Sequence, residues 1–129
     1  MTALNAQLRD SVGLRMRVTG DADGRPLLLV HPLAANLTFW DDFVAALGPR
    51  FRCVVYDQRG FGGSLAPSRP WTLDDHVRDI EWVREQAGLQ RFAIMGNAVA
   101  NIMALHYAHR HPARIDAVQA ADAAHAGVR

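Results

Sequence analysis

The chain has 129 residues, half of them hydrophobic and 21% charged, and its formal net charge is +1. This length favours one domain with a substantial core, and the composition is typical of a globular protein. The basic residues are all arginine and are scattered along the chain, which argues against a nucleic-acid-binding protein. No apolar segment is long enough to cross a bilayer, and the first residues lack the pattern of a signal peptide. We therefore expect no membrane partner. Because Cys53 is the single cysteine, we also expect a cytoplasmic protein with no internal disulfide.

Three early segments have the patterns of β-strands. Residues 14–18 alternate apolar and polar side chains, which predicts a half-buried strand near the edge of a sheet. Residues 27–30 and 53–56 are apolar throughout, as in parallel strands that are covered on both faces. The first of these two strands runs into a loop at residues 31–36, and the second runs into a glycine-rich loop at residues 57–64. These segments predict the first part of a mainly parallel sheet.

Two capping patterns predict where the first helices begin. Thr38 and Asp41 have the spacing of a capping box, so Thr38 is expected to cap a helix over residues 39–47. Thr72 and Asp75 repeat that spacing. The segment after Thr72 carries apolar residues on one helical stripe, which predicts a helix that packs on the sheet. These residues are Leu73, Val77, Ile80 and Val83.

A strand, a sharp turn and a helix are predicted within about twenty residues around Ala98. Residues 92–95 form a short apolar run, and an apolar helical pattern follows from Val99. Gly96 and Ala100 are small, so the strand and helix backbones can pass close together. The side chain between them, at Ala98, is expected at the top of the sheet. This is the layout of the nucleophile elbow G-x-S-x-G, with alanine in place of the serine.

Residues 115–121 form the last predicted strand. Predicted strands alternate with predicted helices along the whole chain, which indicates an α/β fold with a doubly wound, mostly parallel sheet. No internal repeat, low-complexity segment or linker divides the sequence. We therefore expect residues 1–129 to form a single domain.

Four motifs, in this order, resemble those of the α/β-hydrolase superfamily. They are Leu28–Pro32 with Trp40 downstream, Tyr56–Ser64, Met95–Ala100 and His109–Ile115. The likeness covers residues 14–122 and is greatest to the esterase and enol-lactonase branch. It implies that this chain corresponds to the N-terminal part of the hydrolase domain, which bears the nucleophile and has about six of the eight strands of that fold.

The resemblance implies a catalytic centre at the predicted elbow. Ala98 would occupy the position of the nucleophile. The backbone N–H groups of Leu33 and Val99 would form the oxyanion hole, and Val99 would also lie at a helix N-terminus, where the helix dipole favours negative charge. His31 would shape the oxyanion loop through hydrogen bonds to the backbone rather than act as a base.

Four further residues are expected around this centre. Asn97 and Trp40 would lie near the substrate pocket. Asp57 and Arg59 would hold the glycine-rich loop by charge-assisted hydrogen bonds rather than take part in the chemistry. No cofactor is implied, and no carboxylate or cysteine lies at metal-ligand spacing near His106, His109 and His111, so no metal is expected.

The sequence departs from the hydrolase pattern in two ways. Ala98 has no nucleophilic atom, and the acid and the histidine of the family usually follow later strands than this chain contains. The prediction is therefore a serine-hydrolase-like chain for a small ester, lactone or enol-lactone that is inactive or impaired as written. An epoxide hydrolase or a dehalogenase would need aspartate at position 98. The alternative is a naturally non-catalytic module that binds a small molecule or a partner chain.

The end of the sequence leads to an expectation about partners. In the family's sheet, the strand that corresponds to residues 115–121 lies in the interior, whereas here it would form an edge. An unpaired apolar edge strand tends to pair with another chain, so we expect a second chain or a C-terminal fragment at these residues. Asp122 and His125 follow this strand and are interpreted as exposed polar residues rather than as the acid and the histidine.

Overall fold

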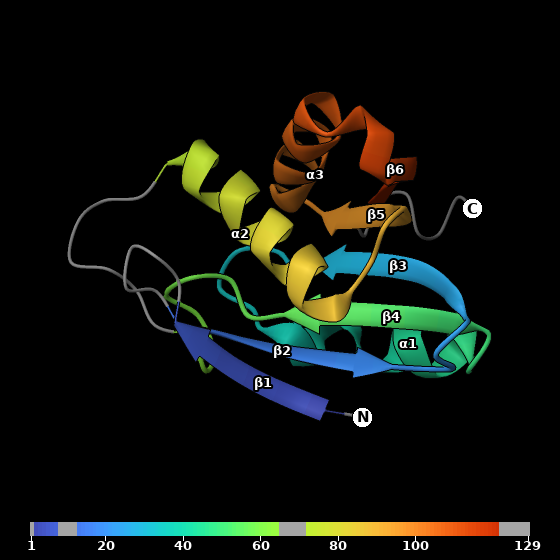
Figure 1. Cartoon of the computed structure of the whole chain (residues 1–129). Helices are drawn as coiled ribbons and strands as arrows, with labels where there is room; N and C mark the ends of the chain where they lie inside the picture. Colours follow the sequence, from blue (N-terminus) through green and yellow to red (C-terminus); the bar gives the residue numbers. More distant parts are fainter. Residues whose placement is uncertain (1, 8–12, 65–71, 122–129) are drawn as a thin grey trace.

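The computed structural model describes residues 2–7, 13–64 and 72–121, and it shows a six-stranded sheet in the order β1-β2-β4-β3-β5-β6 (Figure 1). The strands are β1 (Thr2–Gln7), β2 (Gly13–Thr19), β3 (Arg25–Val30), β4 (Phe51–Tyr56), β5 (Phe92–Asn97) and β6 (Ile115–Ala121). β2 pairs antiparallel with both β1 and β4, whereas β4, β3, β5 and β6 are parallel. The predicted α/β fold with a mostly parallel sheet is therefore confirmed.

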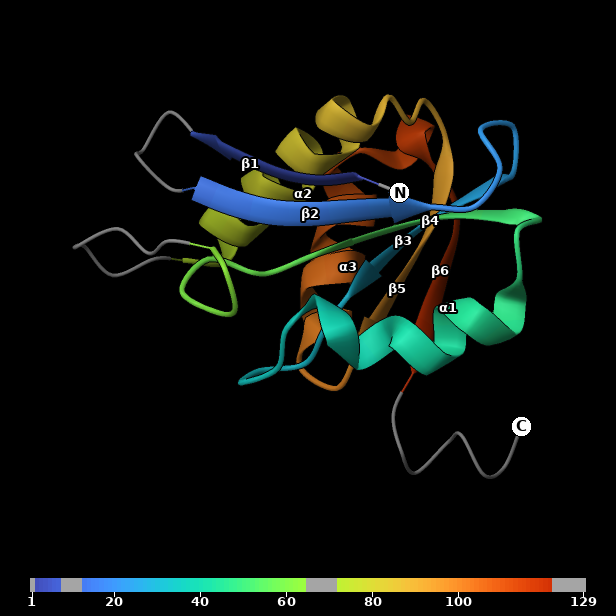
Figure 2. The ribbon, with the colours of Figure 1, turned by 90° about the horizontal axis from the view of Figure 1, so that it is seen from below.

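Helices cover both faces of this sheet. The helices are η1 (Leu37–Trp40), α1 (Asp41–Leu47), α2 (Leu73–Ala87), α3 (Ala100–Arg110) and η2 (Pro112–Arg114). Figures 1 and 2 show α2 and α3 on one face and α1 on the other. Alternate residues of β3 point to opposite faces: Leu28 and Val30 pack in the cluster with α2 and α3, whereas Leu27 and Leu29 pack in the cluster with α1. This arrangement explains why β3 is apolar without alternation.

The start of α2 follows the predicted capping box. The Thr72 hydroxyl accepts a hydrogen bond from the Asp75 N–H, and the Asp75 carboxylate accepts one from the Thr72 N–H. Val77, Ile80 and Val83 are buried on the predicted stripe. α2 therefore begins at the predicted residue and packs on the sheet through the predicted side chains.

The prediction that Thr38 caps the first helix is wrong. A 3₁₀ turn, η1, precedes α1, and its N-cap is Asn36, whose side-chain oxygen accepts hydrogen bonds from both the N–H and the hydroxyl of Thr38. Asparagine is at least as good an N-cap as threonine. Asn36 therefore initiates the turn two residues before Thr38.

The sequence predicts one edge strand of the sheet, β6, but not the other, β1. β1 has no strong strand pattern of its own, and it joins the sheet through antiparallel pairing with β2, from Thr2 opposite Val18 to Gln7 opposite Gly13. β6 was predicted as a strand and is one, and it pairs with β5 alone within the described sheet. β6 is therefore an edge strand here.

Candidate functional site

The turn between β5 and α3 has the strained geometry that the sequence predicts. Ala98 lies in the left-handed region with a φ of 54°, and it is exposed. The first helical hydrogen bonds follow at once, because the Asn101 N–H donates to the Ala98 carbonyl at 3.0 Å and the Ile102 N–H donates to the Val99 carbonyl at 3.0 Å. A left-handed alanine is unfavourable by roughly 1–2 kcal/mol. The surrounding structure therefore imposes this conformation.

Gly96 makes this sharp turn possible. A Cβ on Gly96 would overlap the carbonyl of Ala100 and approach the Asn101 nitrogen to 2.8 Å. The last part of β5 and the first turn of α3 thus touch through their backbones. Only a residue without a side chain fits between them, so the small residues predicted to allow close passage do so.

The loop after β3 is a second strained turn. The Ala35 N–H donates to the Pro32 carbonyl at 3.3 Å, and Ala34 has a φ of 62°. A positive φ at the third position of such a turn is characteristic of type II turns, which usually carry glycine there. The turn leaves Leu33 exposed at its tip, with 53% of its surface accessible.

His31 is buried directly before this turn and has a defined tautomer. Its Nδ1 lies 2.7 Å from the Pro32 carbonyl oxygen, so it carries the proton, and its Nε2 accepts the Gln58 N–H at 3.0 Å. Burial, above all, lowers the pKa of His31 below its usual value. A neutral ring that is hydrogen-bonded on both sides has no nitrogen free to act as a base, and it connects the loop after β3 to the loop after β4.

The two strained turns lie at the same end of neighbouring strands. Val30, the last residue of β3, is opposite Gly96 of β5 in the parallel register. The loop that carries Leu33 and the turn that carries Ala98 therefore begin side by side at the C-terminal edge of the sheet, as Figure 2 shows. Asn97 is half-buried between Gly96 and Ala98. Val99 is 47% exposed and precedes the first residue of α3. N–H groups in the first turn of a helix have no intrahelical acceptor, so they can bind a ligand.

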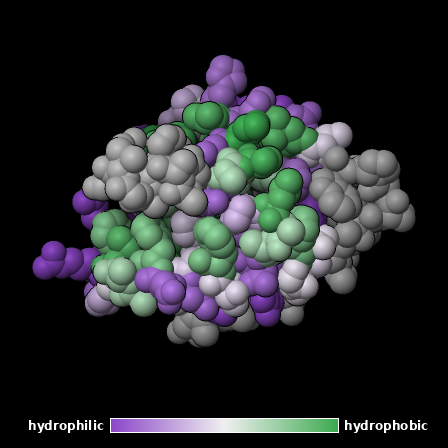
Figure 3. Space-filling model, turned by 180° about the vertical axis from the view of Figure 1, so that it is seen from behind, coloured by the Kyte–Doolittle hydropathy of each residue, from purple (hydrophilic) through white to green (hydrophobic). Residues whose placement is uncertain are grey.

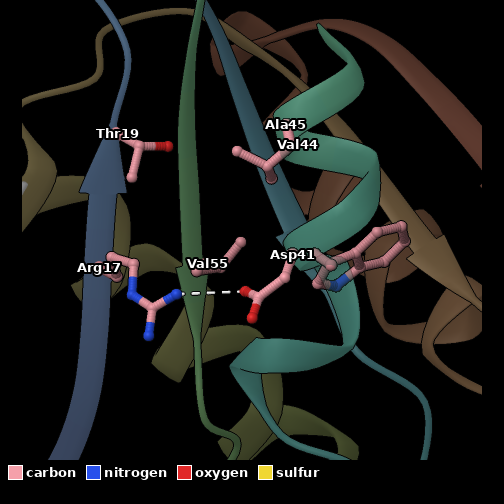
Figure 4. A pocket seen from close by; sticks show the side chains of 7 residues that line it. Arg17, Thr19, Asp41, Val44, Ala45 and Val55 are labelled. Atoms are coloured by element: carbon pink, nitrogen blue, oxygen red, sulfur yellow. Dashed lines mark hydrogen bonds and ion pairs between the residues drawn. The ribbon is translucent and has the colours of Figure 1, made fainter. Parts of the chain in front are cut away.

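Trp40 lies on the α1 face of the sheet. It is buried in the cluster on the α1 face and lines a hollow of about 190 Å³ with residues of β2, β4 and α1 (Figure 4). Arg17 of β2 points toward Asp41 there, with its Nη1 3.2 Å from a carboxylate oxygen. The described lining of this hollow contains no residue of the turn at Ala98. The expected place of Trp40 beside a substrate pocket stays a prediction.

Large hydrophobic side chains are exposed on the elements that follow β3 and β5. They come from the loop after β3, from η1, from the turn at Ala98 and from α3, and they are Leu33, Phe39, Val99, Ile102 and Leu105. Figure 3 shows hydrophobic residues at the surface of the face opposite to that of Figure 1. Exposed apolar groups of this kind often mark a surface that binds a ligand or another protein.

The comparisons with known proteins agree with the geometry of the sheet and of the turn. A family model described as the alpha/beta hydrolase fold matches residues 25–126. The chain belongs to the α/β-hydrolase family. Its strand order and its turn between β5 and α3 are therefore those of a hydrolase fold and not only similar to them.

Individual members of the α/β-hydrolase family differ in their chemistry. RutD of Pantoea ananatis, assigned as a carbamate hydrolase, is 32% identical over 100 residues, which are 76% of this chain and 36% of RutD. Haloalkane dehalogenase 2 of Mycobacterium bovis is 36% identical over 88 residues, which are 67% of this chain and 31% of the dehalogenase. The crystal structure of the enol-lactonase from Burkholderia xenovorans LB400 is 28% identical with a TM-score of 0.83, and the match covers 89% of this chain and 45% of the lactonase. The chain spans less than half the length of these α/β hydrolases.

Sequence reasoning missed two residues of this site. Ala34 has no glycine or asparagine signal that would mark a positive φ, and the turn geometry alone reveals it. From the sequence, Arg15 is only a polar position of an edge strand, yet its side chain reaches the loop after β4.

Asp122 and His125 lie outside the described residues. Among the described helices, none is both long and apolar enough to cross a membrane.

Proposed function

We propose that this chain is the nucleophile-bearing part of an esterase- or lactonase-type hydrolase, with Ala98 at the nucleophile position. The observation that carries the proposal is the pair of strained turns. Among the described residues, Ala34 and Ala98 are the two non-glycine residues with positive φ, and they follow neighbouring parallel strands. Backbone strain of this kind concentrates at functional sites.

The backbone groups of these turns suit the binding of an oxyanion. Leu33 is at the tip of the first turn, and Val99 is at the start of α3. In our proposal, their two N–H groups stabilise the negative charge that develops on a carbonyl oxygen of an ester or lactone. In our proposal, His31, which burial keeps neutral and which bonds to the backbone on both sides, positions the first of these groups. The reaction needs no cofactor in this proposal.

Loss of the nucleophile makes the chain as written inactive in this proposal. In subtilisin, removal of the catalytic serine costs a factor of about 10⁶ in kcat. An oxyanion hole and substrate binding retain about 10³-fold catalysis over water in such enzymes. Dehalogenases and epoxide hydrolases need aspartate at the position of Ala98, so the similarity to a dehalogenase does not extend to this position.

The test is Ala98→Ser, produced together with the C-terminal part of the similar enol-lactonase and assayed with p-nitrophenyl acetate. The expected result is release of nitrophenol at a rate well above that of the unchanged pair. Ala34→Ser, which also places a serine at a positive φ on the same edge, is the matched control. Equal rates for the two serine variants would contradict the proposal.

A second candidate function is binding of a partner chain, and the free edge of β6 favours it. Within the sheet of described residues, β6 has no strand on the side away from β5, so its backbone groups there are open to pairing. Our proposal is that residues 115–121 pair with a second chain or with a C-terminal fragment that continues the sheet. The lengths of the relatives support this, because they contain more than twice the residues matched here. A monomeric mass at high concentration and no 1:1 complex with the C-terminal lactonase part would contradict it.

The two candidates are distinguishable by their ligands. A hydrolase part should gain turnover with Ala98→Ser. A non-catalytic module should instead bind compounds that have no hydrolysable bond, and a thermal-shift screen would detect this. Location in the cytoplasm remains a proposal that rests on the single buried cysteine, Cys53.

A further inference from the structure

The carboxylate of Asp57 connects three separate segments of the chain. Asp57 is fully buried after β4. Its Oδ1 accepts the Leu37 N–H at 2.6 Å, and its Oδ2 accepts the Gly63 N–H at 2.7 Å. Leu37 ends the loop that carries Leu33, and Gly63 lies in the glycine-rich loop. One buried carboxylate therefore holds the far end of the candidate oxyanion loop.

Arg15 of β2 supplies the charge that balances this carboxylate. Its Nε lies 2.9 Å from the same Oδ2 of Asp57, and its carbonyl accepts the Asp57 N–H at 2.8 Å. Ser64 closes the arrangement, because its hydroxyl accepts the Arg15 N–H at 2.8 Å and donates to the Asp57 carbonyl at 2.6 Å. We call Arg15, Leu37, Asp57, Gly63 and Ser64 the Asp57 cluster.

The Asp57 cluster leaves no room for side chains at two glycines of the loop. A Cβ on Gly62 would overlap the Asp57 carboxylate, and a Cβ on Gly63 would lie 3.0 Å from the Arg15 side chain. The carboxylate and the guanidinium therefore fill the volume under the glycine-rich loop. A buried carboxylate that loses its cation pulls in water or moves, because an unpaired charge is costly in a protein interior.

From these contacts we infer that Arg15 is a positioning residue, which acts through Asp57 to set the position of the Leu33 backbone N–H. The loop of residues 31–37 is held at its start by His31 and at its end by the bond from the Leu37 N–H to Asp57. Arg15 lies two strands away from β3, on the far side of β4, and is connected to the loop through the Asp57 carboxylate. This inference rests on the proposed function, in which the Leu33 N–H binds the oxyanion.

Arg17 provides a matched control for Arg15. Both arginines lie on β2 two residues apart, so both point to the same face of the sheet, and each pairs with one aspartate. The Arg17 partner is the exposed Asp41 of α1, which is not part of either loop. Arg15→Leu and Arg17→Leu therefore remove equivalent groups, and only the first reaches the Asp57 cluster.

The experiment is amide hydrogen exchange, followed residue by residue by NMR on the full chain. In Arg15→Leu, we expect exchange at Leu37 and Gly63 to accelerate by about tenfold or more, since both N–H groups donate to a carboxylate that has lost its cation. Exchange at residues 33–36 should also accelerate. Amides of α2, α3 and β5 should change no more than in Arg17→Leu. Arg15→Lys retains a cation and should recover most of the protection.

The outcomes separate this inference from the proposed function. If the Arg15→Leu change is uniform over the whole chain, or equal to that of Arg17→Leu, Arg15 is only structural and the inference is overturned. If Arg15→Leu does not fold, Asp57→Asn is measured in its place. Exchange must then accelerate selectively at the same amides. If these amides respond as expected while Ala98→Ser gains no hydrolysis, the positioning stands and the esterase proposal fails.

Discussion

Arg59 and Asp79 form a bidentate ion pair that is almost completely buried. The Nε of Arg59 lies 2.7 Å from one carboxylate oxygen of Asp79, and an Nη lies 2.7 Å from the other. Their side chains are 1% and 2% exposed. Arg59 follows β4 and Asp79 lies within α2, so the pair attaches the glycine-rich loop to α2.

Asp79→Ala should strongly destabilise the protein, because it leaves the Arg59 guanidinium buried without this partner. The expected loss of unfolding free energy is about 3–5 kcal/mol, measured by urea denaturation. The matched control is Asp116→Ala, which removes the partner of Arg91 in a pair with both side chains more than half exposed. That loss should stay below about 1 kcal/mol. Similar losses for the two variants would contradict this assignment.

Replacement of Gly96 tests the close contact between β5 and α3. Gly96→Ala places a Cβ against the backbone of Ala100, which cannot move as a flexible side chain could. We expect a loss of more than about 2 kcal/mol, because overpacking of a tight contact costs about 1–3 kcal/mol or more. Gly88→Ala places its Cβ in open space, with no atom within 4 Å, but its positive φ of 72° in the left-handed region adds strain. Its loss should be near 1 kcal/mol, and a smaller loss for Gly96→Ala than for Gly88→Ala would contradict the contact.

Ala98→Gly tests the strain at the turn. Glycine adopts a positive φ without a steric penalty, whereas alanine at 54° is strained by roughly 1–2 kcal/mol. Part of this gain is offset by the greater freedom of glycine in the unfolded chain. We therefore expect Ala98→Gly to raise stability by up to about 1 kcal/mol. The control Ala104→Gly, in the middle of α3, should lower it by at least about 1 kcal/mol.

Stability should fall as the pH is lowered from 7 to 5. Burial and the nearby Arg59 lower the pKa of His76 from 6.5 to about 4, and burial lowers the pKa of His31. Between pH 6.5 and 4, the unfolded chain binds more protons than the folded one, so the unfolding free energy decreases with falling pH. By this linkage, His76 alone contributes a loss of about 2 kcal/mol at pH 5. Urea titrations of His76→Gln should show a shallower slope of the unfolding free energy against pH than those of the unchanged protein.

Much of the fold could be predicted because the decisive signals are local. The apolar runs of β3 and β4, the stripe of α2 and its capping box depend on residues next to one another in the sequence, and each was found where expected. The capping site of η1 was missed because Asn36 and Thr38 carry nearly equal capping signals. Only the three-dimensional turn decides which oxygen faces the free N–H groups.

The parts that could not be predicted depend on contacts that are distant in the sequence. β1 becomes a strand because β2 presents an open edge to it. Arg15 and Asp57 are 42 residues apart, and no spacing rule joins them. For the candidate site, the turn at Ala98 could be predicted from small residues, whereas the strain at Ala34 arises from a loop that is held at both ends by buried side chains.

Three consecutive residues after β4 are each anchored to a different part of the chain. Asp57 binds β2 and Leu37, Gln58 binds His31, and Arg59 binds α2. These contacts hold the segment after β4 from three sides, so a strand, a loop and a helix together restrain its motion. A ligand would accordingly meet a rigid rim, already shaped before it arrives.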